Sequence, residues 1–154
     1  MAKLNLHWYY TFFFLYLEPF SALAGAIAAL SPQLYLSMTD SKWSSPSVDF
    51  ATGTVVNQIS NLYMFFALTE FLVFRAGRHN LPVWRALVTA MLIADFGHLL
   101  SGWRLGLEQY WNIASWGWME AGSVGFVYAG AATRIMFLSG IGVVVQTDGE
   151  RKRI

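Results

Sequence analysis

The chain has 154 residues, of which 56% are hydrophobic and 12% are charged, and its formal net charge is +1. Soluble proteins carry about 25% charged residues, so this composition excludes both a soluble domain and a disordered chain. The absence of cysteine excludes disulfides, thiolate metal ligands and thiol nucleophiles, and the small net charge offers no attraction for nucleic acid. An integral membrane protein is the class that remains.

Four apolar windows are long enough to cross a bilayer, which takes about 20 helical residues. In chain order they span about residues 8–30, 52–74, 83–104 and 116–138. The fourth window could continue through the apolar run that ends at Val145. We therefore predict an all-α fold, a polytopic antiparallel bundle of four transmembrane helices that forms a single transmembrane domain over residues 1–154.

The basic residues predict the orientation of these helices, because cytoplasmic loops carry an excess of lysine and arginine. The N-terminus, the second loop and the C-terminus share one side, which holds Lys3, Arg75, Arg78, Arg85, Arg151, Lys152 and Arg153. The other side holds Lys42 and Arg104. We expect both termini to be cytoplasmic, in the endoplasmic reticulum or a similar internal membrane. The basic tail is interpreted as a topology anchor, with contact to anionic lipid as the alternative.

Ionisable side chains are rare inside membrane helices and often mark function. In the first window, Glu18 lies near the midplane, and Pro19 removes a backbone hydrogen bond beside it. The resulting kink is either part of a site or a simple bend in the helix. In the second window, Asn57 and Asn61 are four residues apart and share one face in the lumenal half.

The third and fourth windows add polar groups at similar depth. Asp95 lies near the midplane, and His98 lies one turn further on the same face. Glu120 lies about one turn inside the lumenal end of the fourth window. Closer to the cytoplasmic side, Glu70 and Arg134 have similar depths and are predicted to form a structural ion pair between helices.

These side chains indicate acid–base chemistry in a site screened from water. Asp95 with His98 would be the acid–base pair, Glu18 and Glu120 the supporting carboxyls, and Asn57 with Asn61 the groups that position substrate. Aromatic rings could stabilise a cationic intermediate; the candidates are Tyr63, Trp103, Trp118 and Tyr128. Isomerisation or cyclisation of a lipophilic molecule that enters from the membrane fits these groups.

Three other interpretations of the same residues remain open. The Asp95–His98 pair could only fasten helices together, or it could bind a ligand without turnover. A proton-coupled transporter could use the same carboxyls, although a four-helix chain would then have to oligomerise. No metal site is expected, because His7 and His79 lie at the opposite membrane edge from His98. No cofactor is expected either, because phosphate-loop and dinucleotide-binding motifs are missing.

Several strings of the sequence resemble a family of small, largely uncharacterised fungal four-helix membrane proteins. They include Leu17-Glu18-Pro19-Phe20-Ser21-Ala22, Asn57-Gln58-Ile59-Ser60-Asn61-Leu62-Tyr63, Ile93-Ala94-Asp95-Phe96-Gly97-His98, Tyr110-Trp111-Asn112 and Gly125-Phe126-Val127-Tyr128-Ala129-Gly130 with Arg134. The resemblance covers about residues 16–142. It implies the four-helix fold and a setting in fungal secondary metabolism.

The architecture is also similar to the four-helix domain of emopamil-binding sterol isomerases and the sigma-2 receptor. Those proteins place acids and a histidine in a lipid-accessible cavity, whereas the histidine here lies on the third helix. The leading hypothesis is a cofactor-independent membrane isomerase or cyclase that acts on a lipophilic metabolite. The alternative is a non-catalytic membrane protein that binds such a ligand or scaffolds membrane-bound pathway enzymes, with self-association as a further possibility.

Overall fold

The structure is a computed structural model that describes residues 3–40, 43, 45, 47–117, 120–147 and 150–153. Within these residues, four helices are long and apolar enough to cross a membrane. They are Trp8–Ala29, Phe50–Ala76, Leu81–Ser101 and Ala121–Leu138. The predicted all-α class with four long apolar helices is confirmed, and the predicted windows match these helices to within a few residues at their ends.

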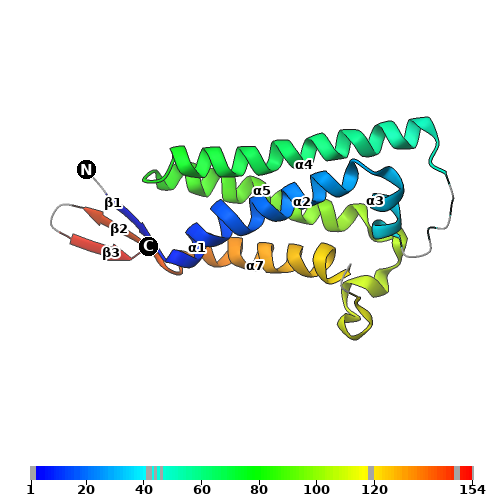
Figure 1. The fold of residues 1–154 in the computed structure, drawn as a ribbon. Coiled ribbons are helices and arrows are strands. Elements are labelled where there is room, and N and C mark those ends of the chain that lie inside the picture. The colour runs from blue at the N-terminus through cyan, green and yellow to red at the C-terminus, as the bar shows by residue number, and fades with distance from the viewer. Residues whose placement is uncertain are drawn as a thin grey trace. The chain divides into compact units, whose positions relative to one another are not determined.

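The first and fourth spans are each built from more than one helical segment (Figure 1). The helices are α1 (Trp8–Phe12), α2 (Glu18–Ala29), α3 (Pro32–Thr39), α4 (Phe50–Ala76), α5 (Leu81–Ser101) and α7 (Phe126–Leu138). The π-helical turns are η1 (Phe13–Leu17) and η5 (Ala121–Gly125), and the 3₁₀ turns are η2 (Trp103–Leu105), η3 (Leu107–Tyr110) and η4 (Ile113–Ser115). The strands are β1 (Lys3–Leu6), β2 (Val143–Thr147) and β3 (Glu150–Arg153).

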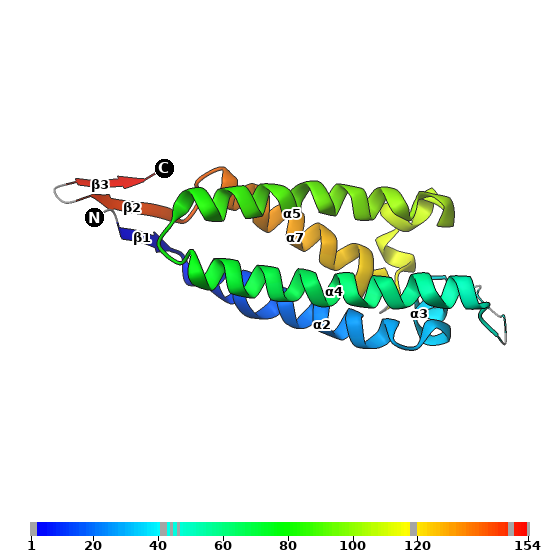
Figure 2. The ribbon, with the colours of Figure 1, turned by 90° about the horizontal axis from the view of Figure 1, so that it is seen from above.

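The chain divides into two compact units. We call residues 11–76 the first unit, and residues 1–10 together with 77–154 the second unit. In the first unit, α2 and α4 lie side by side and run antiparallel; in the second unit, α5 and α7 do the same (Figures 1 and 2). A single domain over residues 1–154 stays a prediction.

Small residues of α2 allow the close approach of α4 in the first unit. Ala22, Ala26 and Ala29 are buried along one side of α2, which lets the two backbones come together. The hydroxyl of Ser60 donates a hydrogen bond of 2.7 Å to the backbone carbonyl of Ala26, so α4 is also tied to α2 by a polar contact. In the same unit, the rings of Phe14 and Phe74 pack with centroids 5.3 Å apart and are fully buried.

The predicted break beside Pro19 takes the form of a π-helical turn. The backbone N–H of Glu18 donates to the carbonyl of Phe13, five residues earlier, as η1 ends and α2 begins. Pro19 lies in the first turn of α2, where the missing N–H of a proline is tolerated. The wider turn therefore absorbs the proline, and the helix continues as one membrane span.

Large apolar side chains form the core of the second unit. Trp84 of α5 packs on Phe137 of α7 with ring centroids 5.8 Å apart, and Tyr10 packs on Phe137 with ring centroids 5.3 Å apart. Val88 and Met91 continue the buried side of α5. This packing brings the middle of α5 against α7, where two charged residues lie.

The second unit also contains a small sheet, which the sequence did not predict. Its strand order is β1-β2-β3, and both pairs are antiparallel. The sequence allowed the fourth span to continue to Val145, but α7 ends at Leu138 and the apolar run that follows enters β2. Gly140 and Gly142, with φ of 82° and 72°, reverse the chain between helix and strand in a conformation that glycine tolerates.

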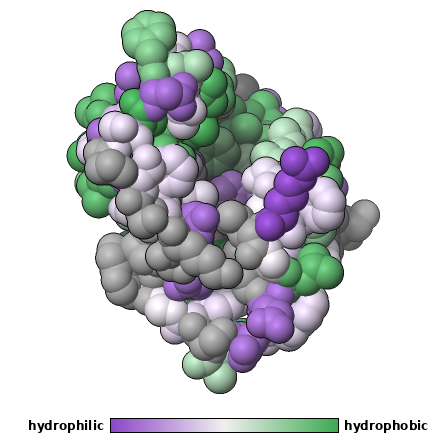
Figure 3. All heavy atoms as spheres, turned by 90° about the vertical axis from the view of Figure 1, so that its right-hand side faces the viewer, coloured by the Kyte–Doolittle hydropathy of each residue, from purple (hydrophilic) through white to green (hydrophobic). Residues whose placement is uncertain are grey.

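Large apolar side chains are exposed in the segment between α5 and η5. Figure 3 shows hydrophilic residues beside apolar ones on the face that it views. Trp103, Trp111 and Ile113 are more than half exposed in the segment between α5 and η5. Exposed aromatic residues at the end of membrane spans are typical of the membrane–water boundary.

Asp49 caps the start of α4 and gives a prediction about pH. Its carboxylate accepts hydrogen bonds from the hydroxyl and the backbone N–H of Thr52. The hydroxyl bond is the larger cause, and the two bonds lower the pKa of Asp49 below its usual value. A lowered folded-state pKa means that the cap stabilises fully above the unfolded pKa of about 3.9 and is lost as pH falls through the folded value.

We therefore expect the thermal midpoint of Asp49→Asn to fall less at acid pH than that of the wild type. The thermal midpoint of the wild type should exceed that of the variant near neutral pH, and the difference should shrink as pH falls below about 4. A difference between the two proteins that stays constant across this range would contradict the assignment.

Candidate functional site

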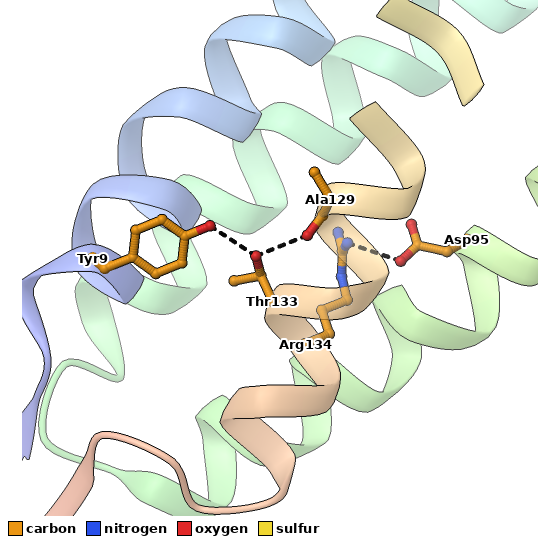
Figure 4. Close-up of polar contacts among 5 residues, drawn as sticks. All are labelled: Tyr9, Asp95, Ala129, Thr133 and Arg134. Atoms are coloured by element: carbon orange, nitrogen blue, oxygen red, sulfur yellow. Dashed lines mark hydrogen bonds and ion pairs between the residues drawn. The ribbon is translucent and has the colours of Figure 1, made fainter. Parts of the chain in front are cut away.

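A buried ion pair joins α5 and α7 inside the second unit. The Nη1 atom of Arg134 donates to Oδ2 of Asp95 at 2.8 Å (Figure 4). The side chain of Arg134 is 1% exposed and that of Asp95 is 12% exposed. Opposite charges attract more strongly where water is excluded, so this ion pair is a strong contact between the two helices.

The guanidinium of Arg134 reaches Asp95 by crossing its own helix over Gly130. A Cβ atom on Gly130 would lie less than 3.0 Å from Nη1 of Arg134, a separation that real Cβ atoms essentially never show. Gly130 stands four residues before Arg134, and side chains in a helix point toward the N-terminus. A residue without a side chain at this position therefore lets the arginine lie flat and face α5.

A second set of polar contacts involves Thr133, the residue that precedes Arg134. The hydroxyl of Thr133 donates to the carbonyl of Ala129 at 2.8 Å, and the hydroxyl of Tyr9 lies 2.9 Å from Thr133 Oγ1 (Figure 4). Because the single hydrogen of Thr133 is used on Ala129, Tyr9 is the donor in the other bond. Figure 4 shows Tyr9 and Asp95 on opposite sides of α7, so this helix carries polar contacts on both sides.

This geometry separates the two members of the predicted acid–base pair. The Asp95 carboxylate is bonded to Arg134, and no hydrogen bond or ion pair joins it to His98 in the described part of the chain. The His98 imidazole is exposed. The Asp95 carboxylate is thus engaged by a cation of the neighbouring helix, and such charge-assisted bonds are stronger than neutral ones.

Glu120 lies at the start of a helix and bonds to its backbone. Its Oε2 atom accepts a hydrogen bond of 3.0 Å from the backbone N–H of Gly117, and the N–H of Ala121 donates to the carbonyl of Gly117. A glutamate that reaches back three residues in this way satisfies one of the free N–H groups of a helix start. Its role as a supporting catalytic carboxyl stays a prediction.

Two substitutions separate these roles of Glu120. Glu120→Ala should lower the free energy of unfolding by about 0.5–1 kcal/mol, because the cap is lost. Glu120→Gln should retain most of that stability, since the amide oxygen still accepts from Gly117. Denaturant unfolding in detergent measures both. If the glutamine variant were as unstable as the alanine variant, the capping assignment would be wrong.

The remaining predicted polar residues lie in the first unit. Glu18 and Glu70 are buried, with exposures of 6% and 1%, whereas Asn57 and Asn61 are exposed. The predicted ion pair between Glu70 and Arg134 would join the two units and stays a prediction; what the second unit shows is Arg134 bonded to Asp95.

The predicted aromatic residues have separate surroundings. A Cβ atom added to Gly25 would lie 3.6 Å from the ring of Tyr63, and the hydroxyl of Tyr63 lies 3.3 Å from the hydroxyl of Tyr35. Tyr128 donates to the carbonyl of Tyr110 at 2.9 Å.

Trp103 and Trp118 are the other two predicted aromatic residues. Trp103 is 53% exposed, and the Arg104 guanidinium lies 5.5 Å from the centre of its ring. Trp118 lies outside the described residues. Among the residues that are described, no cluster of three or more histidine and acidic side chains could hold a metal ion.

The comparison with known families covers nearly the whole chain. A family described as "Domain of unknown function (DUF7704)" matches residues 3–143. The chain belongs to this family. Neither the curated proteins nor the solved structures contain a match.

In this member of the DUF7704 family, three residues of the polar site were not predicted from the sequence. They are Tyr9, Gly130 and Thr133. Gly130 could have been found from its spacing to Arg134, because a glycine four residues before an arginine leaves room for the long side chain to lie along the helix. Tyr9 is far from Thr133 in the sequence, so no local pattern could have indicated their contact.

Proposed function

We propose that the chain is a non-catalytic integral membrane protein that binds a lipophilic metabolite for membrane-bound enzymes of the same pathway. The observation that carries this proposal is the bond between Arg134 and Asp95. In this bond Asp95, the central acid of the predicted catalytic set, joins α5 to α7. The contact of Glu120 with its own helix start supports the same conclusion, because a second predicted catalytic carboxyl is used in folding.

The biological setting is part of the proposal. The resemblance to small fungal membrane proteins favours a pathway of secondary metabolism, whose hydrophobic intermediates partition into membranes. The charge bias of the loops favours the endoplasmic reticulum with both termini in the cytoplasm. Because the chain has no cysteine, single cysteines introduced at Asn5 and Ser45 can test the topology. A membrane-impermeant thiol reagent should label only the first of them from the cytoplasmic side.

A second candidate is the isomerase or cyclase, and a specific observation favours it. The His98 imidazole has no hydrogen-bond or ion-pair partner within the described residues, and it lies one turn from Asp95 on the same helix. An open imidazole beside a fixed carboxylate is able to exchange a proton with a bound molecule. In this candidate, His98 transfers the proton and Asp95 stabilises the positive charge that develops.

Metabolite profiling of the native host distinguishes the two candidates. The gene is deleted and then restored as wild type or as His98→Ala, with purified protein assayed in parallel for conversion of any precursor that accumulates. We expect the deletion to lower the amount of product, His98→Ala to restore it, and the purified protein to convert nothing. A precursor that accumulates in both the deletion and the His98→Ala strain would support the enzyme. An unchanged profile after deletion would contradict both candidates.

A further inference from the structure

An open groove lies in the second unit, where β1 meets the first span and β2 leaves the fourth. Its volume is about 330 Å³, and its lining includes His7, Trp8, Tyr9, Met136 and Ile141. The backbone N–H of His7 donates to the carbonyl of Gly142 at 2.9 Å, so the two ends of the chain are tied together beside it. None of these residues belongs to the predicted acid–base site.

The position of the groove in the chain places it at the membrane boundary. Trp8 is the first residue of the first span, and Met136 is two residues from the end of the fourth. Trp8 is 68% exposed and Ile141 is 59% exposed, so the groove offers an aromatic and aliphatic surface at this depth. A tryptophan at such a position prefers the region where lipid headgroups meet acyl chains.

Basic residues of the sequence fall in the strands of the sheet that begins at the groove. Lys3 precedes His7 by four residues, and the register of the sheet pairs β1 with β2 and β2 with β3, the strand that contains Arg151, Lys152 and Arg153. The Nδ1 atom of His7 accepts from the backbone N–H of Tyr9, which leaves Nε2 as a hydrogen-bond donor.

We infer that this groove binds an anionic phospholipid of the surrounding membrane. Its acyl chains lie against Trp8, Met136 and Ile141, and its phosphate faces His7 and the basic strands. Charge complementarity selects the anionic headgroup, because each lysine or arginine near a membrane surface adds to the attraction of anionic lipid. The inference is independent of the proposed function, since it uses neither Asp95 nor His98.

The test measures the lipid that stays on the purified full-length protein. The protein is reconstituted in equal amounts of phosphatidylserine and phosphatidylcholine, extracted into mild detergent and analysed by mass spectrometry. The wild type should retain phosphatidylserine. Trp8→Ala should retain much less. The triple variant Arg151→Gln, Lys152→Gln, Arg153→Gln should retain less by at least roughly tenfold. Trp111→Ala is the matched control, because Trp111 is 64% exposed but lies outside the groove.

Salt supplies a second measurement that needs no substitution. Raising the ionic strength from about 0.1 M to 1 M shortens the screening length from about 10 Å to 3 Å and should release phosphatidylserine from the wild type. Equal retention of the two lipids by the wild type would overturn the inference. Retention by Trp8→Ala at the level of Trp111→Ala would also overturn it, because the attraction would then be diffuse and the groove would not be the site.

Discussion

Replacing Asp95 with leucine should lower the free energy of unfolding by about 3–5 kcal/mol, one of the two largest effects that we expect from a single substitution. The change removes the carboxylate that lies 2.8 Å from the Arg134 guanidinium, whose side chain is 1% exposed. A buried charge that loses a bonded partner costs more than the pair itself contributed, because water cannot reach it. Denaturant unfolding in detergent, monitored by the near-UV circular dichroism of the tryptophan residues, measures this loss.

The double variant Asp95→Leu, Arg134→Met tests the cause of that loss. Removing both charges leaves apolar side chains of similar size, so most of the lost stability should return. Asp95→Asn should lie between the wild type and Asp95→Leu, because its amide oxygen can still accept from Arg134. A double variant as unstable as Asp95→Leu alone would show that the ion pair is not what joins α5 to α7.

Gly130→Ala should destabilise the protein by about 1–3 kcal/mol, although alanine is the better helix former. The added Cβ would clash with Nη1 of Arg134, so the guanidinium must leave its position and lengthen its bond to Asp95. The same unfolding measurement applies. In the background of Arg134→Met the substitution should cost much less, because the clash is with the arginine alone.

Gly97→Ala is the matched control for this prediction. Gly97 lies within α5, is exposed, and has nothing within 4 Å of an added Cβ. The control should leave stability unchanged or raise it by up to about 1 kcal/mol, because glycine is the poorer helix former. If the two alanine variants behaved alike, the space above Gly130 would not be needed by Arg134.

Together these variants separate folding from function at the Asp95 site. Loss of stability in Asp95→Leu with recovery in the double variant is what a fastening pair requires. If the double variant is stable and the host profile is restored by it, the proposed non-catalytic role gains support. A stable double variant that fails to restore the profile would assign Asp95 or Arg134 a direct part in recognising the metabolite or acting on it.

The membrane-spanning helices follow from local sequence, because the requirement for long apolar segments is set by the thickness of the bilayer. The windows around residues 8–30 and 52–74 could be recognised as membrane spans from their composition and length alone. The strand that begins at Val143 could not be read in this way, since a short apolar run is compatible with either a helix or a strand. Its conformation depends on Gly140, Gly142 and the pairing with β1.

The sequence by itself determined that the chain is an apolar four-helix protein with acids, a histidine and an arginine inside its spans, because hydropathy and spacing are local properties. Only the tertiary structure decided that Asp95 bonds to Arg134, while His98, three residues away on the same helix, does not. Helical spacing relates residues of one helix to each other, but the partner of a buried charge depends on how the neighbouring helix is rotated. That rotation is set by packing along both helices, including the room that Gly130 leaves for an arginine.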